Sequence, residues 1–452
     1  MAFTVTEVVR QFKTDWTKCL EPEVILDACR AEKHVWRDRI LNPVVLVQVF
    51  LLQVLHGNTA CQHLRHLAGI TFSAGAYCLA RMALPLAVFQ RLLRNVSERI
   101  NGGQIDAMWH GHRTLYLDGT GFSMPDTAEL QTEFGQPGGQ KKGCGFPVAH
   151  LLTLFHAGTG MLLDVFTAPL RTHDLAMAAQ LHPSLKPNDV LVADRGFCSY
   201  AHFALLLQSG VHAVMRIHQK MVVNFTPHRP HVVRRHGRKS AAEKGLPSSR
   251  WIRTLGYEDQ VVMWMKPVSC PTWMTADQFL TLADGIEIRE HRYRVQIPGF
   301  RVQVVTLATT LLDADRYSAS DLADLYRLCW DIETNLSHLK TSMGLDVLKC
   351  KTVDGVLKEM ILFCLLYNLI RLVMLNAART QNVDVRRISF IDALRWLASA
   401  EAVEKLIPLV VNPDCPDRSE PRVRKRRPKQ FPVMKQTRKN PAGCPEKIGK
   451  NA

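Results

Sequence analysis

Two aspartates stand where a short apolar segment of the chain gives way to a glycine-bearing turn. Asp118 follows Leu-Tyr-Leu and precedes Gly119, and Asp194 follows Leu-Val-Ala and lies two residues before Gly196. The end of a strand is the usual position for functional groups in an α/β sheet, and glycine lets the backbone turn sharply and a large ligand approach. A buried carboxylate without a partner is costly, so a salt bridge of Asp194 with Arg195 is the alternative interpretation.

A third acid lies on a segment with two neighbouring stripes of side chains. Between Asp321 and Gly344, apolar residues recur every three or four positions, which predicts one half-buried amphipathic helix. Beside that stripe, Glu333 lines up with two aromatic residues and with Lys340. Taken alone, the segment fits a surface helix with incidental polar residues equally well. The second stripe consists of Tyr326, Trp330, Glu333, Ser337 and Lys340.

The elements around these acids predict a mixed sheet flanked by helices. Alternation and helical spacing give an order of three strands, a helix, a strand, a helix and a strand between residues 113 and 217. This is the order of a ribonuclease H-like α/β fold. The expected strands are 114–118, 148–155, 161–166, 189–194 and 212–217, and the expected helices are 175–181 and 201–208.

Composition and pattern divide the whole chain into four parts. We expect a helical N-terminal DNA-binding domain over residues 1–105, a ribonuclease H-like catalytic core over 106–218 and 311–408, a β-rich insertion domain over 219–310, and a basic flexible tail over 409–452.

The N-terminal part contains the outline of a helix-turn-helix. A second helix starting after Ser73 would present Tyr77 and Arg81 to DNA, with an ordinary helical hairpin as the alternative.

The net charge of +16 is concentrated in the segments 228–239 and 418–452. Localised basic segments suit a polyanion, most commonly nucleic acid, although a solvated tail would also explain them. Lys141 and Lys142 are further phosphate-binding candidates, and a solvated turn explains them equally well. His173 and Asp174 are interpreted as the start of a helix, with the cap at Thr172 or Asp174, in preference to a pair that supports the acids.

The remaining composition favours a cytoplasmic protein without a membrane partner. The apolar runs Pro43–Leu55 and Met360–Leu375 are short or interrupted compared with the roughly 20 apolar residues of a spanning helix. The first residues lack the apolar core of a signal peptide, and the 12 cysteines are scattered without a CxxC pair. Such cysteine usage fits a reducing compartment.

The segment YRLCWDIETNLSHLK resembles the signature helix of bacterial insertion-sequence transposases of the DDE type, in the IS-four branch. That branch carries a Tyr-Arg-Glu-Lys pattern, and Tyr326, Glu333 and Lys340 fall on it at the right intervals. Cys329 occupies the Arg position, which is a departure from the pattern. LDGTGFSMPDT around Asp118 and VADRGF around Asp194 also resemble the family, whose members carry a strand-rich insertion between the second Asp and the Glu.

This resemblance implies a metal-dependent transposase. Asp118, Asp194 and Glu333 would be catalytic and would hold two Mg²⁺ or Mn²⁺ ions, with Asp118 bridging both. Two such ions about 4 Å apart can deprotonate a nucleophile and stabilise the leaving oxygen. Water would release a 3′ hydroxyl at the end of the element, and that hydroxyl would attack target DNA in line.

The resemblance also implies contacts and partners. Tyr326 and Lys340 would contact a phosphate of the transposon end. The arginine of the family pattern is missing at Cys329; either Arg327, about 100° around the helix, reaches across in its place or this contact is lost. The expected partners are double-stranded DNA, as terminal inverted repeats and as target, and a second copy in a homodimer on paired ends. The expected location is the bacterial cytoplasm, at the nucleoid. A catalytically impaired DNA-binding repressor and a ribonuclease H-like DNA nuclease are the alternative functions.

Overall fold

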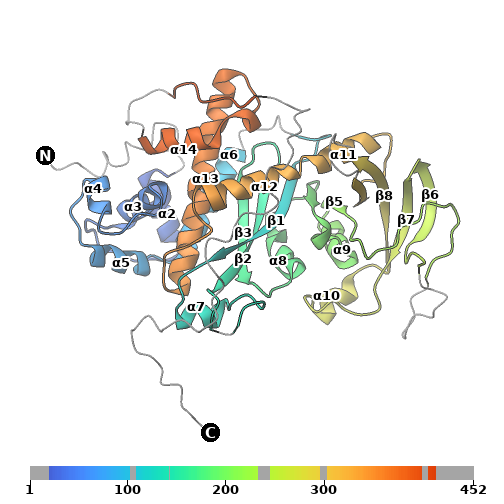
Figure 1. Ribbon diagram of the computed structural model, residues 1–452, viewed down its shortest axis with the longest axis horizontal. Coiled ribbons are helices and arrows are strands. Elements are labelled where there is room, and N and C mark those ends of the chain that lie inside the picture. The colour runs from blue at the N-terminus through green and yellow to red at the C-terminus, as the bar shows by residue number, and fades with distance from the viewer. Residues whose placement is uncertain are drawn as a thin grey trace, which may run out of the picture.

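A mixed sheet of nine strands runs through the described part of the chain in the computed structural model (Figure 1). The structure describes residues 20–101, 108–141, 143–232, 245–295, 303–399 and 406–413. The strands lie across the sheet in the order β3-β2-β1-β4-β5-β9-β8-β7-β6. Their bounds are β1 Thr114–Ser123, β2 Val148–His156, β3 Leu162–Pro169, β4 Val190–Ala193, β5 His212–Arg216, β6 Arg250–Gly256, β7 Asp259–Met265, β8 Gly285–Val295 and β9 Gln303–Thr309.

The first five strands have the order predicted for the core. β1 pairs with β2 in an antiparallel arrangement and with β4 in a parallel one, and β4 in turn runs parallel to β5. A parallel pair needs a crossover connection, which α9 (Tyr200–Gln208) supplies between β4 and β5. Helix α8 (Asp174–Leu181) precedes β4 in the chain. The predicted mixed sheet flanked by helices is therefore confirmed.

The strand-rich insertion extends this same sheet. β9 pairs with β5, and β8, β7 and β6 follow outward, all antiparallel (Figure 1). The short helix α10 (Ala276–Thr281) begins with a capping box at Thr275, in which the side chains of Thr275 and Gln278 bond each other's backbone N–H. Residues 219–310 are thus rich in strands, as predicted, but the hydrogen-bonded sheet joins them to the core. The domain boundaries themselves stay predictions.

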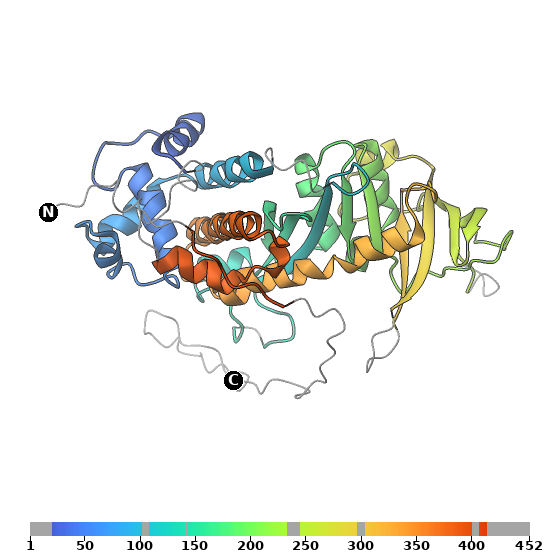
Figure 2. The same cartoon turned by 90° about the horizontal axis from the view of Figure 1, so that it is seen from above.

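Alternate residues of the central strands face two separate apolar cores. In β1, Tyr116 belongs to one core, whereas Leu115 and Leu117 belong to the other. Side chains alternate across a strand, so the side chain at position 118 lies on the same face as Tyr116. Helices α11 (Ala319–Arg327) and α12 (Trp330–Ser337) run along this face, and α8 and α9 cover the opposite one (Figure 2).

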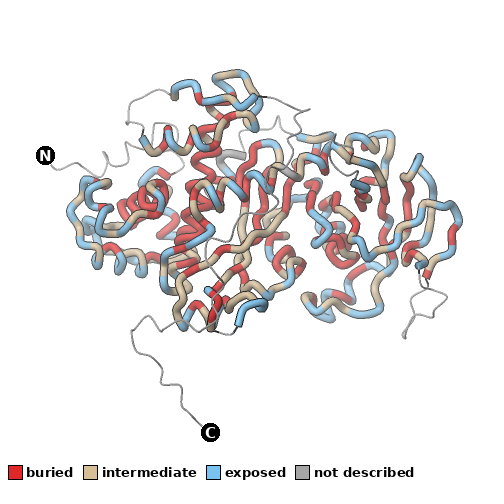
Figure 3. Tube along the Cα trace, in the orientation of Figure 1, coloured by how far each residue is buried: buried red, intermediate tan, exposed pale blue. Residues whose placement is uncertain are grey.

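The described N-terminal residues are helical, as predicted, and pack around one long helix, α13. This helix is long and apolar enough to cross a membrane by length and composition, but 89% of its most apolar stretch is buried inside the protein (Figure 3). The run Met360–Leu375 is therefore a core helix, as expected. The bounds are α2 Pro22–Ala31, α3 Pro43–Leu55, α4 Leu64–Ala68, α5 Ala74–Ala83, α6 Leu86–Asn101 and α13 Val353–Gln381.

Polar side chains fix α13 against the hairpin of β2 and β3. The Asn368 amide accepts a hydrogen bond from the Leu162 N–H at 2.9 Å and donates one to the Leu162 carbonyl at 2.7 Å. Arg371 donates to the Thr159 carbonyl at 2.6 Å. Gly160 has a φ of +66°, and a Cβ there would lie 2.2 Å from the Arg371 guanidinium. Only glycine fits this turn beneath the helix.

The predicted presentation of Tyr77 and Arg81 to DNA is wrong. Ser73 does cap α5, but Tyr77 is fully buried and donates a hydrogen bond to Gln53. The Arg81 guanidinium lies 3.9 Å from the centre of the Phe50 ring and donates to Gln53 at 3.1 Å. The apolar face of α5 turns these two residues inward, so this is a helical hairpin in which Arg81 is a packing residue without a free guanidinium for DNA.

Shorter elements complete the described chain. Helix α7 (Ala128–Glu133) follows β1, and α14 (Phe390–Ser399) packs beside α13. The short turns of helix are His182–Ser184, Arg195–Phe197, Val385–Arg387 and the π-helical turn His338–Ser342. Lys142, residues 233–244 of the basic segment and the whole tail 418–452 lie outside the described residues.

Candidate active site

The pairing of β1 with β4 brings Asp118 and Asp194 side by side. The last residues in register are Leu117 and Ala193, and each aspartate is the next residue of its strand. Neighbouring strands lie about 4.8 Å apart, so the two carboxylates extend from adjacent backbone positions. The prediction that both strands end at an acid holds for β4 only. β1 continues to Ser123 with β2 as its partner, so Asp118 lies within the strand, where β1 extends past the end of β4.

Glu333 approaches this point from the helical layer. It lies on α12, which packs on β1 over the face that Asp118 shares with Tyr116 (Figures 1 and 2). Ile332 and Leu336 bury the apolar stripe of α12 in the core, which leaves Glu333 exposed beside it. Glu333 is close enough for its charge to raise the pKa of Asp118, so three acids that are distant in the sequence lie in the same region of the sheet.

The predicted single helix Asp321–Gly344 is in fact three pieces. A capping box between Ser318 and Asp321 starts α11, and the chain tightens after Arg327 into i→i−3 hydrogen bonds, such as Ile332 N–H to the Cys329 carbonyl at 3.1 Å. α12 then passes into the π-helical turn that contains Lys340. Both irregularities change how side chains before and after them are oriented relative to Glu333, so the predicted straight stripe is wrong in detail.

Tyr326 connects the helical layer to the second aspartate. Its hydroxyl donates a hydrogen bond to Asp194 Oδ1 at 3.0 Å, while its ring is buried. The Asp118 carboxylate accepts a hydrogen bond from the Gly119 N–H at 2.8 Å, and the Thr153 hydroxyl donates to the Asp118 carbonyl. These bonds fix the orientation of both aspartates before any substrate arrives.

The electrostatics of the site identify it as a place for a cation. The pKa of Asp118 is raised to about 6, mainly by burial; the Gly119 N–H lowers this pKa, and the charges of Asp194, Glu333 and Asp174 add to the rise. Burial raises the pKa of Cys329, and the charges of the three candidate catalytic acids Asp118, Asp194 and Glu333 raise it too. The thiol at the predicted arginine position is therefore neutral at pH 7 and adds no positive charge to the acids around it.

The residues fit a divalent metal by charge and donor type. Carboxylate oxygens are the ligands that Mg²⁺ and Mn²⁺ prefer, and the main charges acting on Asp118 all have the same sign. Within the described residues, no three His, Cys, Asp or Glu side chains already converge closely enough to hold an ion.

Comparison with known proteins decides the family. The family model for the transposase DDE domain matches residues 109–369, more than half of the chain, and the match includes all three acids. The chain belongs to the DDE transposase family. The predicted resemblance is thereby confirmed.

Individual relatives agree with this family. InsZ of Escherichia coli (strain K12) is 30% identical over 103 residues, which are 23% of this chain and 34% of InsZ. The transposase InsG for insertion sequence element IS4, from the same organism, is 22% identical over 374 residues, which are 78% of this chain and 77% of InsG. A solved structure of the piggyBac transposase synaptic complex with hairpin DNA matches with a TM-score of 0.43 and 9% identity, covering 85% of this chain and 78% of that one.

The predicted DNA contacts of this DDE family member differ in their surroundings. Arg327 is 68% exposed, with its guanidinium 3.4 Å from Asp324. Lys141 is exposed in the turn after α7, and Lys340 is half-buried. Tyr326 already bonds Asp194, so its role in the structure is to hold an acid. The DNA contacts of Tyr326, Lys340, Arg327 and Lys141 stay predictions, and Lys142 lies outside the described residues.

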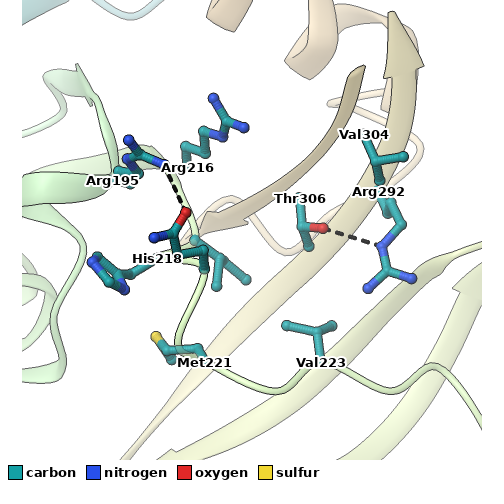
Figure 4. A pocket seen from close by; sticks show the side chains of 10 residues that line it. Arg195, Arg216, His218, Met221, Val223, Arg292, Val304 and Thr306 are labelled. Carbon is teal, nitrogen blue, oxygen red and sulfur yellow. Dashed lines mark hydrogen bonds between the residues drawn. The ribbon is translucent and has the colours of Figure 1, made fainter. Parts of the chain in front are cut away.

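An arginine-lined groove lies beside the acids (Figure 4). It has a volume of about 160 Å³, and Arg195, Arg216 and Arg292 line it together with His218 and an apolar wall that includes Val304. None of the described residues that line it carries a carboxylate. Arg195 directly follows Asp194, and Arg216 is close enough to Tyr326 to lower its pKa against the raising effect of burial. Two of the arginines that line the groove are therefore close to the candidate active site.

Sequence reasoning missed the groove, and it assigned Asp174 to a helix cap. Arg216 ends β5 beside β4, so the rule that selected the two aspartates would also have selected this arginine. Arg292 sits in the middle of the long strand β8, where no local pattern singles it out. The cap of α8 is in fact His173, so the Asp174 carboxylate does not cap the helix.

Proposed function

We propose that this chain cleaves DNA at the ends of an insertion sequence and joins those ends to target DNA, with Asp118, Asp194 and Glu333 as the catalytic and metal-binding residues. The observation that carries the proposal is the register of β1 and β4, which places two aspartates side by side under the helix of Glu333. Membership in the DDE transposase family supports it.

The reaction needs negative charge to be neutralised on a resistant phosphodiester. When bound, two Mg²⁺ or Mn²⁺ ions would lower the pKa of the attacking water or hydroxyl and stabilise the leaving oxygen. By analogy with the family, Asp118 would help to hold both ions, and Asp194 and Glu333 would hold one each. Tyr326 would keep Asp194 oriented, and the Gly119 N–H would keep Asp118 oriented, as their present hydrogen bonds do.

DNA is the partner that the charge distribution supports. Arg195, Arg216 and Arg292 surround a groove without acids beside the catalytic edge, and arginine binds phosphate through a forked set of donors. The basic segments 228–239 and 418–452 would add contacts by charge. The DNA would be the terminal inverted repeats and the target, bound by a homodimer that cuts paired ends. Such a protein would act in the bacterial cytoplasm at the nucleoid, and the core would be ribonuclease H-like.

Cys329 keeps one other function open, that of a DNA-binding repressor with an impaired core. The neutral thiol leaves the acids without the positive charge that the family pattern supplies at this position. A ribonuclease H-like nuclease would differ from both by releasing cleaved DNA without any joined product. Incubation of the protein with Mg²⁺ and the DNA that flanks its gene separates the three, since only the transposase gives joined product.

The site assignment is tested by conservative variants in that assay. Asp118→Asn, Asp194→Asn and Glu333→Gln should abolish nicking and joining while DNA binding remains, because each removes a charged ligand and little volume. Asp324→Asn, which removes an exposed acid from the adjoining helix α11, is the matched control and should react like the wild type. Nicking by Glu333→Gln at the wild-type rate would refute the assignment of that residue.

A further inference from the structure

A fourth carboxylate reaches the catalytic edge from the face opposite Glu333. Asp174 is the first residue of α8, whose cap is the ring of His173, accepting a hydrogen bond from the Leu175 N–H at 3.2 Å. The Asp174 side chain is 42% exposed, and its ion-pair partner among the described residues is His150, with Oδ1 and Nδ1 3.4 Å apart. Its carboxylate is thus available to the site.

Asp174 and His150 together lie against both segments that follow the candidate metal ligands, the strand after Asp118 and the helical turn after Asp194. A Cβ on Gly196 would lie 3.5 Å from Asp174 Oδ2, and a Cβ on Gly119 would lie 2.6 Å from His150 Nε2. Gly119 follows Asp118, and Gly196 lies two residues after Asp194. The pair therefore lies against β1 and the segment after β4, next to both aspartates in the chain but on the face opposite the Asp118 side chain.

The charge of Asp174 acts on the same space. Together with Asp194 and Glu333, it is one of three carboxylates whose charge acts on Asp118. A divalent cation near these carboxylates would offset their mutual repulsion. Its position on the α8 face complements that of Glu333 on the α12 face.

We propose that Asp174, held by His150, is a positioning residue that orients the water ligands of the cation bound at Asp118 and Asp194. This inference rests on the proposed function. Mg²⁺ keeps several waters when it binds to proteins, and carboxylates that accept hydrogen bonds from such ligands fix their direction. Asp174 acts through those waters, on the side of the site that faces away from α12.

The test is the affinity of the full chain for Mn²⁺ in the absence of DNA, measured by calorimetry. Asp174→Asn should weaken Mn²⁺ binding by about 10- to 100-fold, as loss of a supporting carboxylate does at other metal sites. His150→Gln should shift the affinity in the same direction by less, because the carboxylate remains. Asp277→Asn is the matched control, since it removes an exposed acid from the first turn of α10 that is not among the acids acting on Asp118.

The variants also separate this inference from the proposed function. Thermal unfolding identifies any variant that fails to fold, and Asp174→Ser, which suits the start of a helix, is the second variant for that case. If Asp118→Asn loses Mn²⁺ binding while folded Asp174→Asn and Asp174→Ser bind like Asp277→Asn, the inference is overturned and the proposed function stands. If Asp118→Asn binds Mn²⁺ like the wild type, the metal site itself is wrong, and the inference fails with it.

Discussion

The surroundings of Asp118 disfavour the charged form of its carboxyl group. Its side chain is half-buried and the charges of three other carboxylates act on it, whereas the proposed chemistry requires the charged form. The hydrogen bond from the Gly119 N–H offsets part of this cost, and a bound divalent cation would offset the rest. When no cation is bound, the charge of Asp118 therefore destabilises the folded protein.

The raised pKa of Asp118 predicts how the free energy of unfolding changes with pH. The pKa of Asp118 rises from 3.8 to about 6 on folding, so the folded chain binds a proton more tightly than the unfolded chain. The free energy of unfolding should fall as pH rises between these values, by up to about 3 kcal/mol from this group. Asp118→Asn should remove this fall and be the more stable protein at pH 7 without metal.

Chemical denaturation at several pH values, with and without Mg²⁺, measures this effect. Mg²⁺ should stabilise the wild type at pH 7 and leave Asp118→Asn unchanged, because only the charged site binds the ion. If the free energy of unfolding of the two proteins without metal depended on pH in the same way, the raised pKa of Asp118 in the folded protein would be contradicted.

At the scale of elements, the site depends on α13 as much as on the strands that carry the acids. Asn368 bonds both backbone groups of Leu162 and also reaches the Ser97 hydroxyl at 3.2 Å, so one amide joins α13, β3 and α6. α13 thus fixes the hairpin of β2 and β3, on which β1 and Asp118 are aligned.

Asn368→Leu should destabilise the protein by about 2–3 kcal/mol, because a side chain of similar size leaves a buried N–H without a partner. Asn376→Leu, on a half-buried turn of the same helix, is the control and should change the free energy of unfolding by less than about 0.5 kcal/mol. Urea denaturation compares the two variants. An Asn368→Leu protein as stable as the wild type would show that α13 is held by its apolar contacts alone.

Sequence patterns predicted these elements unevenly. The strands of the core and the edge position of Asp194 followed from apolar runs that end at a glycine turn, because those signals are local. The break at Cys329 and the π-helical turn at Lys340 did not follow, since the apolar spacing continues through both. The buried face of α5 and the availability of Asp174 depend on tertiary packing, which a pattern of single residues does not contain.

At the scale of the whole molecule, the continuous sheet joins the insertion to the catalytic edge. Because β9 pairs with β5, Arg292 of β8 comes to line the same groove as Arg216, on the other side of it (Figure 4). Arg292 is held by Glu258 and by the Thr306 hydroxyl, both at 3.1 Å. The insertion therefore contributes one wall of the proposed DNA path, and its own side chains hold Arg292 in that wall.

Arg216→Gln should weaken DNA binding and reduce its salt dependence. Each phosphate contact contributes a slope of about 0.9 in log K against log salt, so the variant should lose about one unit. Arg253→Gln, which removes an exposed arginine from β6 at the outer edge of the sheet, should keep the wild-type slope. Titrations of flanking DNA across a range of KCl concentrations give both slopes. Equal slopes for Arg216→Gln and the wild type would exclude the groove from the DNA path.

The most direct test of the central claim is cleavage of the polypeptide by Fe²⁺ bound in place of Mg²⁺, with ascorbate and peroxide, followed by mapping of the cut sites. Hydroxyl radicals formed at the ion cut the nearest backbone, so one shared site should yield cuts near residues 118, 194 and 333 together. All three should disappear on addition of excess Mg²⁺ and in Asp118→Asn. Cuts near only one of these residues, or cuts that persist in Asp118→Asn, would contradict a metal site formed by the three acids.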